Sequence, residues 1–133
     1  MRDFVDIEPA ADGMSLRMSE NVTEVLWDVF ESFAKALRDP QDPVHGRLEL
    51  GSELEAVREA ADRVLGFWTR TTFLVVEHDR LDDLMMIVGL ARFRYVDRRG
   101  RGPKKDRLTV HWLSHVNSRL AFLRSPALFR PNV

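Results

Sequence analysis

Residues 52–69, SELEAVREAADRVLGFWT, carry the strongest secondary-structure signal in the chain. Ser52 with Glu55 three residues later matches a capping box, in which side chains satisfy free backbone N–H groups of the first helical turn. Apolar residues then recur at the helical period, while charged residues fill the opposite face. The apolar stripe comprises Leu54, Val57, Ala61, Val64, Leu65 and Trp68. The stretch therefore predicts an amphipathic helix.

The sequence upstream of this helix predicts a second one over residues 21–38. Asn21 and Glu24 match another capping box, and proline at position 40 ends the pattern because the residue before proline avoids the helical region. Residues 1–18 lack sustained periodicity. We expect them to form an N-terminal arm, with a short strand at 4–7, ahead of a single globular domain at 19–133.

Downstream of the 52–69 helix, residues 71–77 are rich in β-branched residues and favour a strand. A continuation of the preceding helix fits this short run equally well. Asp79 can cap a third helix over 80–90, and a last helix is predicted over 114–124.

Two runs with a period of two, residues 91–96 and 107–112, flank a stretch rich in Gly, Pro, Arg and Lys. This arrangement predicts a β-hairpin with a long basic tip. The alternative is a pair of helices joined by a basic loop. The expected fold is thus mainly α with a β-hairpin (α+β), with about four helices and a long basic hairpin near the C-terminus.

Acidic and basic residues are unevenly distributed along the chain. Residues 1–91 hold 19 Asp/Glu and 9 Lys/Arg, a balance of −10, whereas residues 92–133 hold 2 Asp/Glu and 11 Lys/Arg, a balance of +9. Such asymmetry favours a polyanionic partner for the C-terminal part, or mutual neutralisation of the two parts within or between copies.

Eight of the basic residues lie within sixteen positions. They are Arg92, Arg94, Arg98, Arg99, Arg101, Lys104, Lys105 and Arg107. Arginine forks suit phosphate oxygens, and each phosphate contact makes binding sensitive to salt. The cluster predicts a nucleic-acid-binding surface, for DNA or RNA, or for another polyanion. The alternative is a solvated turn that keeps a sheet edge from aggregating.

The segment Gly102-Pro103-Lys104-Lys105-Asp106-Arg107-Leu108-Thr109 resembles the wing of PadR-like winged helix-turn-helix regulators. The likeness extends over about 80–113. It implies that the helix at 80–90 reads the major groove while the wing contacts the DNA backbone or minor groove. In this chain that helix carries Asp82 and Asp83 and an apolar run at 84–88. The wing is therefore the better candidate contact.

Composition removes several classes of chemistry. The chain has no cysteine, which excludes disulfides, cysteine-ligated zinc and thiol catalysis. His111 and His115 would share a face only if they lie on one helix, and no HExxH motif accompanies them. We predict no cofactor, no catalytic residue and no metal site, and we favour a non-enzymatic protein. No apolar run is long enough to cross a bilayer, so we expect a cytoplasmic protein that does not interact with a membrane.

Two functions follow from these patterns. The first is a small nucleic-acid-binding protein that contacts phosphates through the basic segment at 92–107. The second is a helical interaction or assembly subunit, homo-oligomeric or with a protein partner, that uses complementary acidic (1–91) and basic (92–133) surfaces. A ligand-binding domain or enzyme with an apolar pocket is a third and less specific alternative.

Overall fold

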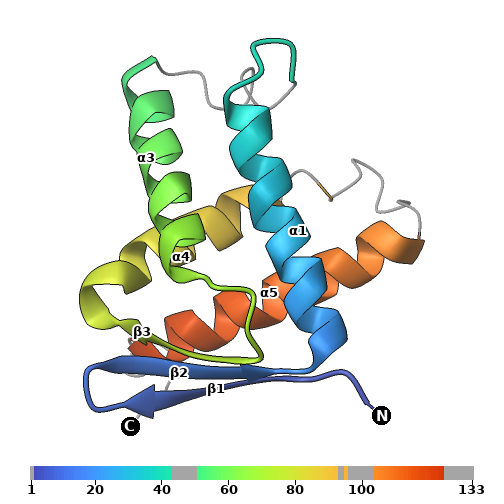
Figure 1. Ribbon diagram of the computed structural model, residues 1–133, viewed down its shortest axis with the longest axis vertical. Helices are drawn as coiled ribbons and strands as arrows, with labels where there is room; N and C mark the ends of the chain where they lie inside the picture. Colours follow the sequence, from blue (N-terminus) through green and yellow to red (C-terminus); the bar gives the residue numbers. More distant parts are fainter. Residues whose placement is uncertain (1, 43–50, 93–94, 96–103, 125–133) are drawn as a thin grey trace, which may run out of the picture.

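The computed structural model describes residues 2–42, 51–92, 95 and 104–124, with the side chains of 51, 52, 104–106 and 124 left out. The protein is an α+β domain in which the helices lie on one face of a small antiparallel sheet (Figure 1). The elements in chain order are β1 Val5–Ala10, β2 Gly13–Met18, α1 Glu20–Leu37, α3 Gly51–Phe67, β3 Phe73–Glu77, α4 His78–Arg92 and α5 Lys104–Arg124.

The N-terminal segment forms a β-hairpin. β1 and β2 pair antiparallel across a two-residue turn, with Val5 opposite Met18 and Ala10 opposite Gly13. Their inward side chains belong to the core and comprise Val5, Ile7, Met14, Leu16 and Met18. The short strand expected at 4–7 overlaps β1, but the segment expected to be an arm supplies two strands of the sheet. A two-residue turn holds such a hairpin together without any helical periodicity.

The central strand of the sheet is β2, because the strand order is β1-β2-β3. β3 pairs antiparallel with β2, with Met14 opposite Val76 and Leu16 opposite Leu74. The strand predicted at 71–77 is therefore confirmed over Phe73–Glu77, and the alternative of a continued helix is wrong. Its alternating burial places Leu74 and Val76 inside, while Phe73 and Val75 are exposed.

The first helix is confirmed, but its predicted capping box is wrong. α1 starts one residue earlier than expected, and its N-cap residue is Ser19. The Ser19 hydroxyl accepts a hydrogen bond from the Phe4 N–H and donates one to the Asp3 carboxylate. Glu24 binds Arg70 instead of capping the helix. The serine side chain thus ties β1 to the start of α1.

The second predicted helix is confirmed as α3. It packs against α1, and the Arg58 Nε donates to the carbonyl of Leu37 at the C-terminal end of α1. Trp68 follows the helix and is fully buried, with its ring edge-to-face against Phe30 at 4.9 Å between centroids. This aromatic pair fixes the chain between α3 and β3 in the centre of the core.

The last two helices correct the expected hairpin. α4 runs from His78 to Arg92, so it is longer at both ends than the helix predicted at 80–90, and the predicted cap at Asp79 is wrong because Asp79 lies in the first turn. α5 is helical from Lys104 to Arg124. The strand predicted at 107–112 is therefore wrong, and two helices joined by a basic connection stand in place of the hairpin. The wing strand that the PadR-like resemblance requires after Pro103 is likewise helical.

The physical reason for this correction lies in residues beyond the alternating run. Buried positions on α5 are Thr109, Leu113, Val116 and Leu120, spaced by three or four residues as in a helix with one apolar face. The Arg92 guanidinium lies 3.5 Å from the Ser114 hydroxyl, and a Cβ placed on Gly89 would lie 3.9 Å from Asn117. The contact of residue 92 with residue 114 and of residue 89 with residue 117 means that α4 and α5 run antiparallel to each other.

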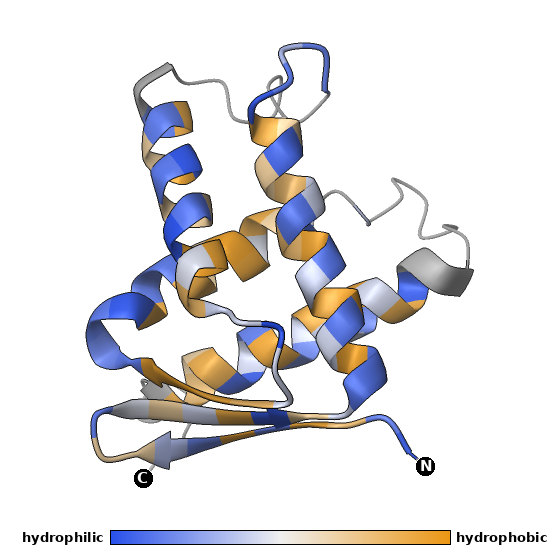
Figure 2. Cartoon of the chain, viewed as in Figure 1, coloured by the Kyte–Doolittle hydropathy of each residue, from blue (hydrophilic) through white to orange (hydrophobic). Residues whose placement is uncertain are grey.

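The apolar faces of the helices point toward each other and toward the sheet (Figure 2). Among the described residues, no helix covers the opposite face of the sheet (Figure 1). Among the helices in the described ranges, none is both long and apolar enough to span a membrane.

Candidate interaction surface

The predicted basic cluster lies at the connection between α4 and α5. Arg92 ends α4 and is held by its contact with Ser114, whereas Arg107 is exposed on α5. Lys104 and Lys105 belong to the first turn of α5, but their side chains are not described. Arg94, Arg98, Arg99 and Arg101 lie outside the described residues.

The acidic part of the chain is partly neutralised by its own bases. Within the described ranges, five ion pairs all join residues of 1–91. They are Lys35–Glu31, Arg38–Asp62, Arg58–Glu55, Arg63–Asp83 and Arg70–Glu24. The hydrogen bond from Arg70 lowers the pKa of the Glu24 carboxyl below its ordinary value. Three of these pairs join different segments of the fold, and the pairs Lys35–Glu31 and Arg58–Glu55 each lie within one helix. They neutralise part of the acidic charge, although each exposed pair contributes little to stability.

Arg63 makes the most complete of these links. Its Nε and terminal nitrogen lie 2.6 and 3.0 Å from the two oxygens of Asp83, so that α3 and α4 are joined by a bidentate pair. The hydrogen bond to Asp83 raises the pKa of Arg63. Asp83 is one of the acidic residues that do not suit a helix that reads DNA. In the fold its carboxylate pairs with Arg63 of α3.

A groove of about 590 Å³ runs between α1 and α5. Val25, Leu108 and Trp112 supply an apolar lining, and Asp3 and Asp28 bring carboxylates to it. Leu108 is 52% exposed. The groove therefore combines apolar surface with negative charge.

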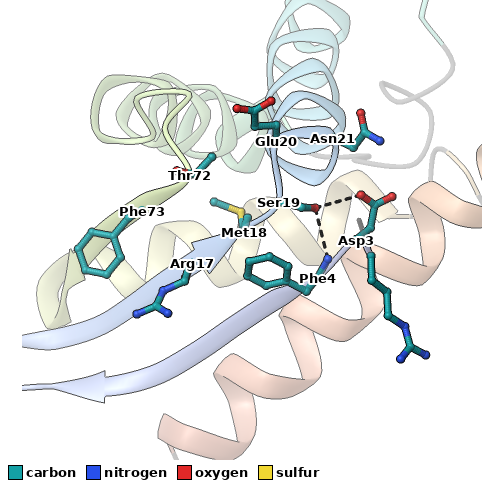
Figure 3. Close-up of a pocket in the computed structure, with 10 residues that line it drawn as sticks. Asp3, Phe4, Arg17, Met18, Ser19, Glu20, Asn21, Thr72 and Phe73 are labelled. Atoms are coloured by element: carbon teal, nitrogen blue, oxygen red, sulfur yellow. Dashed lines mark hydrogen bonds between the residues drawn. The ribbon is translucent and has the colours of Figure 1, made fainter.

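A second hollow, of about 820 Å³, lies where β2 runs into α1 (Figure 3). Its lining is mixed, with Phe4 and Phe73 beside Arg17, Asp3 and Glu20. Arg17 and Phe73 stand next to each other on β2 and β3 (Figure 3). The hollow thus connects with the exposed face of the sheet at its β3 side.

The outer edge of β1 is covered by α5. The Ser19 N–H donates to the Phe4 carbonyl, so alternate residues from Phe4 onward direct their backbone groups to β2. Val5, Ile7 and Pro9 therefore direct theirs outward. His115 Nε2 donates to the Val5 carbonyl at 3.2 Å, and Arg119 Nε donates to the Ile7 carbonyl at 3.3 Å. Pro9 has no N–H to offer, as is typical of an edge strand.

The outer edge of β3 is open by comparison. The Met18 N–H donates to the Thr72 carbonyl, so Thr72, Leu74 and Val76 direct their backbone groups to β2. Phe73 and Val75 therefore direct both backbone groups outward, and Glu77 directs its N–H outward. The Glu77 carbonyl precedes α4, which begins at His78, and accepts a bond of the first helical turn. Within the described part of the chain, the Thr71 hydroxyl, which donates to the Phe73 carbonyl at 2.8 Å, is the one side chain bonded to the backbone of Phe73 or Val75.

The side chains along this open edge are also apolar. Figure 2 shows β3 as largely hydrophobic. Two of its apolar side chains are nevertheless exposed, Phe73 by 53% and Val75 by 49%. A strand edge with free backbone groups and exposed apolar side chains is a template for pairing with another strand. We call Phe73, Val75 and Glu77 the β3 edge.

The histidines do not form a site in the described ranges. His111 and His115 share a face of α5 and flank Trp112, with ring centroids 5.0 and 6.3 Å from the Trp112 ring. Among the described residues, no group of three or more His, Asp or Glu could hold a metal ion. His115 instead bonds to β1.

Comparisons with models of known protein families, with curated proteins and with solved structures gave no match for this chain. The sequence had marked residues 71–77 as a possible strand, but it did not single out Phe73 or Val75. Their alternation with Leu74 and Val76 was the available signal. The sequence does not reveal the strand order β1-β2-β3, and this order is what places β3 at the edge of the sheet.

Proposed function

We propose that this protein is a protein-interaction domain that binds an extended polypeptide segment along the β3 edge. The observation that carries the proposal is the difference between the two edges of the sheet. The β1 edge is closed by His115 and Arg119, whereas Val75 has its backbone groups directed outward and its side chain exposed.

Strand addition supplies both affinity and selectivity. Backbone hydrogen bonds along the edge bind any extended segment, and the exposed side chains select among segments. Phe73 and Val75 favour apolar residues at alternate positions of the ligand. Arg17, which neighbours Phe73 on the same face, favours an acidic residue in the same cross-strand row.

A random library of short peptides displayed on phage tests this function. We expect the selected peptides to alternate apolar and polar residues and to shift the amide NMR signals of β3. Val75→Pro is expected to abolish their binding, because proline removes an outward N–H without removing a bond to β2. Val75→Thr keeps both the N–H and the β-branched shape, so it is the matched control and should still bind. Peptides that bind Val75→Pro as well as they bind the wild type, or that shift only the groove between α1 and α5, would contradict the proposal.

A nucleic-acid-binding function through the basic segment at 92–107 is the second candidate. It is favoured by the eight bases that the chain gathers in this segment, and by the exposure of Arg107 on the first turns of α5. The segment connects the adjacent ends of two antiparallel helices, and such a connection can present several cations to one phosphate backbone.

Binding of duplex and single-stranded DNA and RNA across a range of salt concentrations tests this second candidate. We expect the logarithm of the affinity to fall linearly with the logarithm of salt concentration. Replacing Arg98, Arg99, Arg101, Lys104 and Lys105 by alanine should weaken binding to all sequences. Replacing Arg2 and Lys35, which lie outside the segment, is the control and should have little effect. A complete lack of binding at low salt would exclude this function.

A further inference from the structure

We infer that the β3 edge pairs with the β3 edge of a second copy of this chain, about a two-fold axis that passes beside Val75. This inference rests on the proposed function, because it names a partner for the same edge. It would join two three-stranded sheets into one continuous sheet, with the helices of both copies on the same side.

The backbone of β3 is self-complementary in this arrangement. Val75 is the middle residue of the five-residue strand, and it is one of the residues that direct both N–H and C=O outward. Two antiparallel copies centred on Val75 therefore exchange a pair of N–H···O bonds between the two Val75 residues. The same register places Phe73 opposite Glu77 of the second copy, so that the Glu77 N–H reaches the Phe73 carbonyl.

The exposed side chains also fit this register. Val75 of each copy meets its counterpart, and the two Phe73 rings flank them on the same face, so four apolar side chains shield one another. Arg17 lies beside Phe73, which brings it into the same cross-strand row as Glu77 of the second copy. The antiparallel pairing also keeps the two Glu77 carboxylates at opposite ends of the paired strands, whereas a parallel pairing would place these like charges side by side and destabilise the sheet.

Cysteine substitutions can read this register directly, because the chain has no cysteine of its own. A hydrogen-bonded antiparallel pair has Cα atoms about 5.5 Å apart, which is within the range that a disulfide spans. Val75→Cys alone is therefore expected to form a disulfide-linked dimer under mild oxidation. Phe73→Cys mixed with Glu77→Cys should form a mixed dimer, while either variant alone should form little.

Asp6→Cys is the matched control, since Asp6 is exposed on β1, far from the proposed axis. Sedimentation velocity of the unmodified protein completes the test, with a roughly twofold rise in apparent mass on concentration that Val75→Pro abolishes. A wild-type protein that stays monomeric, with Val75→Cys oxidising no faster to a dimer than Asp6→Cys, would overturn the inference.

The outcomes separate this inference from the function on which it rests. If library peptides bind the β3 edge but the protein is a monomer with no Val75→Cys dimer, the interaction function stands and the self-pairing is refuted. If the dimer forms and no peptide can compete with it, the self-pairing stands and the peptide-binding function is refuted. A dimer that selected peptides dissociate supports both.

Discussion

Gly13→Ala is expected to destabilise the protein by about 3 kcal/mol, as overpacking against a rigid neighbour does. A Cβ on Gly13 would lie 1.9 Å from the carbonyl oxygen of Val76 and 2.8 Å from the Cα of Glu77. Both are backbone atoms of β3, so the clash can be relieved only by displacing the strand. The cause is the close approach of two strands.

Urea unfolding followed by circular dichroism measures this effect. The matched control is Gly66→Ala in α3, where an added Cβ meets nothing within 4 Å. There alanine should raise the stability by up to about 1 kcal/mol, because it has the higher helix propensity. Equal unfolding midpoints for Gly13→Ala and the wild type would contradict the close packing of β2 against β3.

Trp68→Ala is expected to cost about 3–5 kcal/mol, the usual loss when a large buried aromatic side chain is removed. Trp68 is completely buried and packs edge-to-face on Phe30. The substitution would remove that contact and leave a cavity between α1, α3 and the sheet. Thermal unfolding should show a large drop in the midpoint temperature.

Trp68→Phe separates the packing of the ring from its polar group. The Trp68 Nε1 is buried and has no hydrogen-bond partner among the described residues, so replacing indole by phenyl removes an unsatisfied donor while it keeps an aromatic ring beside Phe30. We expect a clearly smaller loss of stability than for alanine. An equal loss for the two variants would show that the size of the indole, and not aromatic contact, determines the stability at this position.

The longer elements of the fold could be predicted from the sequence because their apolar periods extend over several turns. This was true of α1 and α3, and the exposed-and-buried alternation of residues 73–77 indicated β3. Residues 107–112 satisfied a period of two and a helical period at once. Residues beyond this run favour the helix over the strand, because Leu113, Val116 and Leu120 continue the helical period and are buried in the core.

The N-terminal hairpin was hidden by Pro9 and Gly13, which usually interrupt regular structure. In the fold, the backbone nitrogen of Pro9 faces away from β2, so its lack of an N–H costs no bond between the strands. Gly13 lies where only a hydrogen atom fits in place of a side chain. Both roles depend on which strands are neighbours. The open β3 edge could not be predicted for the same reason, whereas the basic cluster at 92–107 needed only a count of charges.

The closure of the β1 edge by His115 and Arg119 sets a limit on assembly. A sheet with two open edges can add copies at both and grow into a fibre. In this protein, pairing through β3 would use the open edge of each copy and leave only the covered β1 edges at the ends. Growth would stop at six strands, twice the three of one copy. In such a dimer, the α5 side chains that bind β1 would prevent further strand addition.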